Sequence, residues 1–398
     1  MHAEQNFGYI PALDHLRGFA ALLVLYFHGS HFIYHKIVFG TPYDPVNWPR
    51  AGNPLTALAI EGHTAVSLFF VLSGFVFTVG SLDKKLNYVG FYRNRLLRTY
   101  PLFLFFLALG VVTHPANFNL WGFLQAVLFM ANDPTAFNGG PFTFVFWSIA
   151  VEWQFYLLFP LLLYAVQHAG WKVLPLLIMI FLAVRSAAFF QVDDMRSLSY
   201  WTLLGRIDQF LIGMLAGIYY RRRFRPGLEL DRLGIAAIGG VLLLLFGFNQ
   251  IGGGGSNGWL WIVWPTLEAL AWAVFLIGYL SLARHFKREV GLALVGLGTV
   301  SYSIYLAHYV VLSFFMERNL DAVLQLQSPV GTAILNTAVM VMPAVLLVSA
   351  ATYYGIERPF LVRRRAYVEA PAGGLNQAHL FGSMPDLIGA VVISEFRK

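Results

Sequence analysis

The first apolar segment of the chain, residues 13–28, reads LDHLRGFAALLVLYFH. Arg17 and His28 are eleven residues apart, and eleven helical steps of about 100° place both side chains on the same side of a helix. At about 1.5 Å per residue they lie roughly 16 Å apart along its axis. Ionisable side chains inside a membrane helix are costly and commonly functional. The alternative is that Arg17 only anchors the helix at the lipid headgroups and His28 is a hydrogen-bonded core residue.

The composition indicates that the whole chain, and not only this first segment, lies in a membrane. Of its 398 residues, 58% are hydrophobic and only 12% are charged, with a mean hydropathy of +0.64. Soluble domains contain about 25% charged residues, so the fold class that we expect is an all-α, polytopic membrane protein. The net charge of +7 is confined to a few short loops, and we expect no nucleic-acid partner. The chain has no cysteine, which excludes a catalytic thiol and a thiolate metal site, and we expect no metal.

The charge distribution predicts the topology. Four segments rich in Lys and Arg, at 84–98, 221–232, 284–288 and 358–365, are expected in the cytoplasm by the positive-inside rule. Two cytoplasmic loops are separated by an even number of crossings, so the short apolar stretch near 120–131 is predicted to be a re-entrant or interfacial helix on the outer side. The result is a bundle of about ten transmembrane helices, at 14–33, 64–81, 97–113, 142–167, 173–190, 201–220, 233–249, 259–282, 293–316 and 331–354.

This topology places both termini in the cytoplasm. The first span is expected to be a retained signal anchor, because no small-residue cleavage site follows it. Residues 1–365 are predicted to form one transmembrane domain. Residues 366–398 lack a clear period and are predicted to be a poorly ordered cytoplasmic tail.

The fourth predicted span contains a polar stripe. Ser148, Glu152 and Tyr156 follow at intervals of four residues and therefore share one face of a helix. Glu152 lies about ten residues from the outer end, roughly 15 Å deep, which suggests a depth comparable to that of His28. A buried carboxylate beside an imidazole can hold a proton for catalysis, or it can simply lock two helices together.

Two other groups of polar residues have alternative explanations. Arg95 and Arg98, three residues apart at the start of a basic helix, can clamp phosphate groups through bidentate bonds or can anchor the helix at the headgroups. His308 shares a helix face with Ser301 and Tyr305, and it suits either an acceptor site or an interhelical hydrogen bond. For Arg206 and Asp208 in the sixth span, and for Arg185 and Glu268, we expect structural pairing between helices.

Taken together, these residues resemble the acyltransferase-3 family of integral membrane O-acyltransferases. Seven motifs occur in order over residues 10–362, each on or beside a predicted span. They are Arg17-x10-His28, FFVLSGF at 69–75, Arg95-x-x-Arg98, the stripe of Ser148, Glu152 and Tyr156, RIDQFLIG at 206–213, SYSIYLAH at 301–308, and ERPF at 357–360.

The resemblance implies transfer of an acyl group, usually acetyl, from cytoplasmic acyl-CoA to a hydroxyl of a sugar or glycoconjugate on the extracytoplasmic side. Acyl-CoA is then a co-substrate, no cofactor is permanently bound, and the partners are a carbohydrate or glycolipid acceptor and membrane lipid. The expected location is a bacterial inner membrane. Some relatives carry an added SGNH hydrolase-like domain, and the length of this chain suggests the stand-alone form.

We expect Arg17, Arg95 and Arg98 to hold the phosphates of the acyl-CoA, and His28 to be the general base that activates the acceptor hydroxyl. Glu152 would orient His28 or the acceptor and stabilise the imidazolium, while Ser148 and Tyr156 would steady the oxyanion or the acceptor. His31, one turn further along, is an alternative base, and an acyl-enzyme route is an alternative to direct transfer. The rival function is a transporter or flippase for a lipid-linked sugar. The sequence leaves open the acceptor, the acyl chain length and the oligomeric state.

Overall fold

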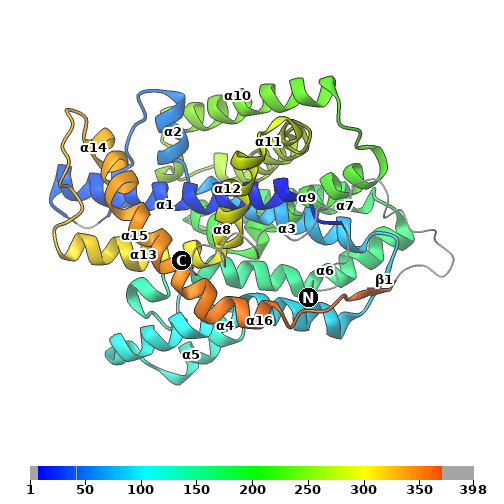
Figure 1. Cartoon of the computed structure of the whole chain (residues 1–398), viewed down its shortest axis with the longest axis horizontal. Helices are drawn as coiled ribbons and strands as arrows, with labels where there is room; N and C mark the ends of the chain where they lie inside the picture. Colours follow the sequence, from blue (N-terminus) through cyan, green and yellow to red (C-terminus); the bar gives the residue numbers. More distant parts are fainter. Residues whose placement is uncertain (1–7, 42, 370–398) are drawn as a thin grey trace, which may run out of the picture.

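The computed structural model describes residues 8–41 and 43–369, which form a bundle of helices with one short two-stranded sheet (Figure 1). The helices are α1 (Pro11–Phe39), α2 (Pro54–Ile60), α3 (Thr64–Ser81), α4 (Tyr88–Thr113), α5 (Leu120–Val127), α6 (Phe146–Ala169), α7 (Val173–Ala188), α8 (Met195–Trp201), α9 (Leu203–Arg223), α10 (Leu228–Gln250), α11 (Leu260–Leu282), α12 (Arg288–Thr299), α13 (Ser301–Glu317), α14 (Pro329–Asn336), α15 (Met342–Thr352) and α16 (Arg358–Leu361). The strands are β1 (Lys85–Leu86) and β2 (Val368–Glu369).

Helix α1 is the central element of the bundle. It begins with Pro11, whose missing N–H costs nothing in the first turn of a helix, and it ends at Gly40, which adopts the left-handed conformation with φ of 64°. In Figure 1, α1 runs through the middle of the molecule, with α10 and α11 on one side and α4 and α6 on the other. Its neighbours α12, α13 and α14 cover it on a third side. The helix that carries Arg17 and His28 is therefore surrounded by protein for most of its length.

Each predicted span corresponds to helix in the structure, which confirms an all-α, polytopic membrane protein. In the described part of the chain, seven helical segments are long and apolar enough to cross a membrane, and α12 with α13, bent by 64°, adds an eighth. The other two predicted spans are α7, which has only 16 residues, and α9, whose polar residues lower its hydropathy. The predicted short element near 120–131 is the eight-residue helix α5.

Helices α3 and α9 cross in close contact because small residues line their interface. A Cβ atom added at Gly213 would lie 3.0 Å from Cα of Val71 and closer still to the carbonyl group of that residue. Glycine therefore allows the two backbones to approach, as small residues commonly do between membrane helices.

We expect Gly213→Ala to lower stability by about 1–3 kcal/mol, because the added methyl group overpacks this crossing. The measurement is the melting temperature of the purified protein in detergent. Gly240→Ala is the matched control, since nothing lies within 4 Å of the position of its added Cβ. Equal melting temperatures for the two variants would show that the close crossing is not needed.

The basic segments gather at one end of the bundle. Burial and the nearby Arg221 lower the pKa of Lys84, which places the first two basic segments side by side. The third basic segment, 284–288, lies beside the start of α1, where the ring of Phe286 stacks on that of His15 with 6.0 Å between the centroids. Strands β1 and β2 pair antiparallel, and this pairing holds the fourth basic segment, 358–365, close to the first. The predicted tail thus begins with residues 366–369 held against the loop before α4, whereas residues 370–398 lie outside the described residues.

The buried charges of α7, α9 and α11 are paired between helices, as the sequence analysis expects. The Arg185 Nη2 atom donates to Asp208 Oδ2 at 2.7 Å, and neither side chain is exposed. Arg206 Nη1 lies 3.5 Å from Glu268 Oε2 and donates to Ser67 Oγ at 3.0 Å. Arg206 and Asp208 thus have different partners, because residues two apart lie on different flanks of a helix.

Candidate active site

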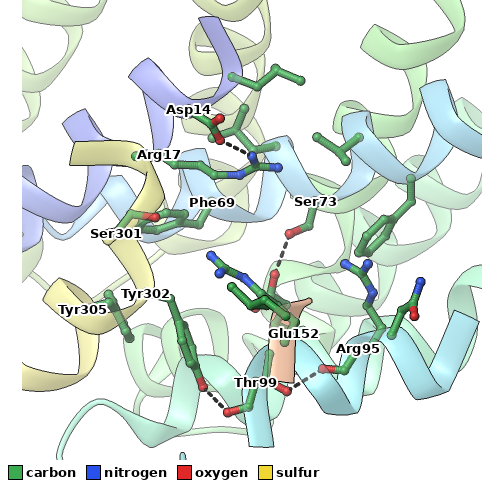
Figure 2. A pocket seen from close by; sticks show the side chains of 18 of the residues that line it. Asp14, Arg17, Phe69, Ser73, Arg95, Thr99, Glu152, Ser301, Tyr302 and Tyr305 are labelled. Atoms are coloured by element: carbon green, nitrogen blue, oxygen red, sulfur yellow. Dashed lines mark hydrogen bonds and ion pairs between the residues drawn. The ribbon is translucent and has the colours of Figure 1, made fainter. Parts of the chain in front are cut away.

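A cavity of about 450 Å³ opens at the basic end of the bundle, and we call it the arginine cavity. Helices α1, α3, α4, α6 and α13 and the segment after α16 supply its walls (Figure 2). Its volume lies in the range of small-molecule sites. Five of its lining residues are arginines, against the two carboxylates Asp14 and Glu152, and these arginines are Arg17, Arg95, Arg98, Arg364 and Arg365.

The arginines differ in how fully their donors are used. Arg17 Nη1 donates to Asp14 Oδ1 at 2.7 Å, and Arg98 forms an ion pair with Glu357. The guanidinium of Arg95 lies over the ring of Phe77, 4.7 Å from its centroid, and its buried Nε has no hydrogen-bond partner in the described chain. Arg95 thus has donor capacity available for an anion in the cavity.

The sequence analysis did not identify Arg364 as a site residue. The chain returns to the cavity after α16 and places Arg364 in its wall. The Nε atom of Arg364 donates to the carbonyl oxygen of Leu361 at 3.2 Å. Burial first, and then the charges of Arg98, Arg95 and Arg17, lower the pKa of Arg364 to about 10. The guanidinium groups are therefore close enough to repel one another, and an anion with several charges would relieve that repulsion. In the sequence, Arg364 belongs to a basic run typical of any cytoplasmic segment.

The predicted polar stripe of α6 faces the arginine cavity. Ser148, Glu152 and Tyr156 all line it, as their spacing predicts. Glu152 Oε1 accepts from Ser73 Oγ at 2.6 Å (Figure 2), and Ser148 Oγ lies 2.5 Å from the hydroxyl oxygen of Tyr305. The cavity thus has guanidinium groups at one end and hydroxyl groups with one carboxylate further in.

His28 lies beyond this inner end. Among the described residues it is not part of the cavity lining, which includes Phe69 and Tyr305, two rings 5.9 Å apart. Behind them, His308 Nε2 lies 2.9 Å from His28 Nδ1, and the His308 ring is 5.8 Å from that of Tyr305. In this structure a layer of aromatic side chains therefore separates His28 from the cavity.

The predicted partnership between His28 and Glu152 is wrong in this structure. His28 packs against Phe144 of the segment before α6, with ring centroids 5.6 Å apart, and it hydrogen-bonds to His308 and to the backbone of Val24. Phe144 precedes Glu152 by eight residues, and the helical part of that stretch, from Phe146, alone spans about 9 Å along the axis. The depths estimated by counting residues are wrong because α1, with 29 residues, extends further toward the outer end than the predicted span of residues 14–33.

The alternative base, His31, is enclosed. Its Nδ1 lies 2.9 Å from the carbonyl oxygen of Phe27, its ring packs against Trp48 and Tyr43, and it has no exposed surface. Its Nε2 has no partner in the described chain, so a proton could bind there only if the aromatic rings moved.

A family model described as an acyltransferase domain matches residues 10–354. The chain is 30% identical over 320 residues to the exopolysaccharide production protein ExoZ of Rhizobium meliloti, covering 77% of this chain and 91% of that protein. It is 27% identical over 406 residues to the acyltransferase MdmB of Streptomyces mycarofaciens, covering 93% and 97%. It is 26% identical over 340 residues to the O-acetyltransferase OatA of Staphylococcus aureus, covering 77% and 51%. No solved structure matches the chain.

Proposed function

Because the chain belongs to the acyltransferase-3 family of membrane O-acyltransferases, we propose that it takes an acyl group from acyl-CoA on the cytoplasmic side. The acceptor in this proposal is a hydroxyl of a sugar or glycoconjugate on the opposite side, and acetyl is the acyl group that we favour. We further propose a bacterial inner membrane as its location, with both termini in the cytoplasm. The observation that carries the proposal is the cavity in which five arginines lead inward to the polar side chains of Ser148, Glu152 and Tyr305.

The donor end of the proposal depends on charge. Coenzyme A carries a 3′-phosphate and a pyrophosphate, and guanidinium groups bind such groups through paired, charge-assisted hydrogen bonds. The lining arginines Arg17, Arg95, Arg98 and Arg364 come from three separated parts of the chain and surround one space. An anion there would exchange their mutual repulsion for attraction. The uncharged pantetheine arm would then extend toward the inner end of the cavity.

The chemistry would take place where the arm ends. The hydroxyls of Ser148 and Tyr305 are 2.5 Å apart and also bond to the carbonyl oxygen of Val145, and one of them would turn from its present acceptor to donate to the thioester carbonyl oxygen as it gains negative charge. Tyr156 and Glu152 line the same region and would hold the arm or the carbonyl in place. For His28 to take part, Phe69 and Tyr305 must move apart, so that the thioester and the acceptor hydroxyl meet between them.

The proposed step transfers the acyl group directly. The acceptor oxygen attacks the thioester carbonyl carbon while His28 accepts the hydroxyl proton. A C–O bond forms and the C–S bond breaks. The coenzyme A sulfur leaves as thiolate and takes the proton from His28. His28 is then neutral again for the next cycle. No metal or redox partner is needed to balance this step.

The acceptor is tested by mass spectrometry of cell-envelope glycans, with and without the gene. The proposal expects one glycan component that carries an additional acetyl group only when the gene is present. Identical glycans in both strains, together with no transfer of label from acetyl-CoA by the purified protein, would refute the proposed function.

The role of Arg95 is tested by substitution. Arg95→Gln should raise the Kd for acetyl-CoA about tenfold or more, because hydrogen bonds to a charged group are worth about 1.5–3 kcal/mol. The measurement is the rise in melting temperature as acetyl-CoA is titrated into the purified protein. Arg93→Gln is the matched control, because Arg93 is on the same helix but exposed. A wild-type Kd in the Arg95 variant would leave this residue with a purely structural role.

A further inference from the structure

We propose that His308 is a positioning residue that sets the tautomer of His28, so that Nε2 of His28 is the atom that accepts the proton of the acceptor hydroxyl. This inference rests on the proposed function, in which His28 acts as the base. It assigns to an imidazole on α13 the part that the sequence analysis gave to Glu152.

A hydrogen bond to the backbone determines the tautomer of His308. Nδ1 of His308 lies 3.2 Å from the carbonyl oxygen of Ile304, one turn earlier on α13. A carbonyl oxygen has no hydrogen and can only accept, so Nδ1 of His308 must be the donor in this bond. In a neutral ring with its hydrogen on Nδ1, the other nitrogen, Nε2, carries a lone pair.

The second nitrogen of His308, Nε2, determines which nitrogen of His28 carries the hydrogen. His308 Nε2 lies 2.9 Å from His28 Nδ1, which is a normal hydrogen-bond distance. Because His308 Nε2 has a lone pair and no hydrogen, His28 Nδ1 must be the donor. Neutral His28 then carries its hydrogen on Nδ1, and its Nε2 is free to accept a proton.

The opposite arrangement would require a buried positive charge. Only if His308 carried hydrogens on both nitrogens could it donate to His28, and its side chain has no exposed surface. Its contacts in the described chain include the backbone of Ile304 and Tyr305 and the rings of Tyr305 and His28, and none of these is a carboxylate. A buried cation without a carboxylate partner is costly, so the neutral arrangement is favoured.

Packing keeps the two rings in this geometry. The planes of His28 and His308 are inclined by 28°, with centroids 4.9 Å apart. The edge-on rings of Phe144 and Tyr309, at 5.6 Å and 5.5 Å, limit rotation of His28. Phe144 and Tyr309 are themselves stacked at 3.9 Å. Side-chain packing therefore reinforces the orientation that the hydrogen bond sets.

The arrangement also suits the reaction itself. When His28 accepts a proton at Nε2, its Nδ1–H still donates to His308, and the bond strengthens as the ring becomes positive. In the Ser-His-Asp triad a carboxylate holds the histidine tautomer, and a change that gives the wrong tautomer lowers kcat by about 10⁴-fold. An imidazole acceptor fixes the tautomer in the same way without adding a negative charge to the membrane interior.

The test compares two substitutions of similar size. Glutamine can place its side-chain oxygen near the position of Nε2 and accept from His28, whereas leucine cannot accept. We expect His308→Leu to lower kcat for acyl transfer at least 30-fold with little change in the KM for acetyl-CoA, and His308→Gln to recover most of that loss. Equal kcat values for both variants, per amount of folded protein, would overturn the inference, since a packing role does not distinguish them in this way.

A second readout does not depend on activity. In protein labelled with ¹⁵N-histidine, the His28 signals, identified by their loss in His28→Gln, should show a protonated Nδ1 and an unprotonated Nε2 in the wild type. In His308→Leu they should shift toward the opposite tautomer. A wild-type His28 protonated at Nε2 would overturn the inference even if transfer is observed. Failure of the wild type to transfer acyl groups would instead refute the proposed function.

Discussion

His28→Gln should lower the rate of acyl transfer by about 10²–10⁴-fold, the usual contribution of a general base, while acetyl-CoA still binds. The separation of these effects follows from the structure, because His28 lies behind Phe69 and Tyr305 and the arginine cavity lies in front of them. Transfer is measured as label moving from acetyl-CoA to the acceptor, and binding as the rise in melting temperature with acetyl-CoA.

Two further variants make this prediction specific. His168→Gln controls for loss of a histidine in general, because His168 is exposed near the end of α6. His31→Gln tests the alternative base, and its rate should stay within a few-fold of the wild type, since aromatic rings enclose His31. A large loss in His31→Gln with full activity in His28→Gln would transfer the role of base to His31.

The largest effect on stability is expected at the ion pair between α7 and α9. Asp208→Leu should lower the free energy of unfolding by about 3–5 kcal/mol, because it leaves the guanidinium of Arg185 buried without its counter-ion. Arg185 would retain hydrogen bonds to the carbonyl oxygen of Gly205 at 2.8 Å and to Thr266 Oγ1 at 2.6 Å, which cannot neutralise its charge. The measurement is unfolding of the purified protein by heat or denaturant.

The double variant Arg185→Met/Asp208→Leu tests the cause. Removal of both charges should restore much of the lost stability, because no uncompensated charge remains in the interior. Arg284→Gln is the surface comparison: Arg284 pairs with Asp231 at 2.7 Å, but its side chain is 37% exposed, and a change below about 1 kcal/mol is expected. A double variant no more stable than Asp208→Leu would contradict this explanation.

The features that could be predicted from the sequence are local. Ten apolar stretches correspond to helix, and the interval of four residues places Ser148, Glu152 and Tyr156 on one face toward a cavity. The intramembrane charges pair with neighbouring helices because lipid provides no other partner. Arg17 does line one space with Arg95 and Arg98, although it lies far from that pair in the sequence.

The features that the sequence could not show depend on how helices are offset along their axes. Residue counts give depth within one helix, but they do not say that His28 lies level with Phe144 and His308 and not with Glu152. Arg364 reaches the cavity only because the chain reverses after α16 and β2 pairs with β1. Its identity as one arginine within a basic run contains no information about that reversal.

The aromatic layer between the arginine cavity and His28 has a consequence for the cell. A passage open from end to end would let protons and ions flow down the electrochemical gradient, and in the proposed reaction it would let water hydrolyse the thioester before the acyl group met its acceptor. Among the described residues, the rings of Phe69 and Tyr305, 5.9 Å apart, line the arginine cavity, and the Tyr305 ring contacts that of His308, the partner of His28. If the chain acts as proposed, these two rings would keep the membrane sealed to ions between turnovers.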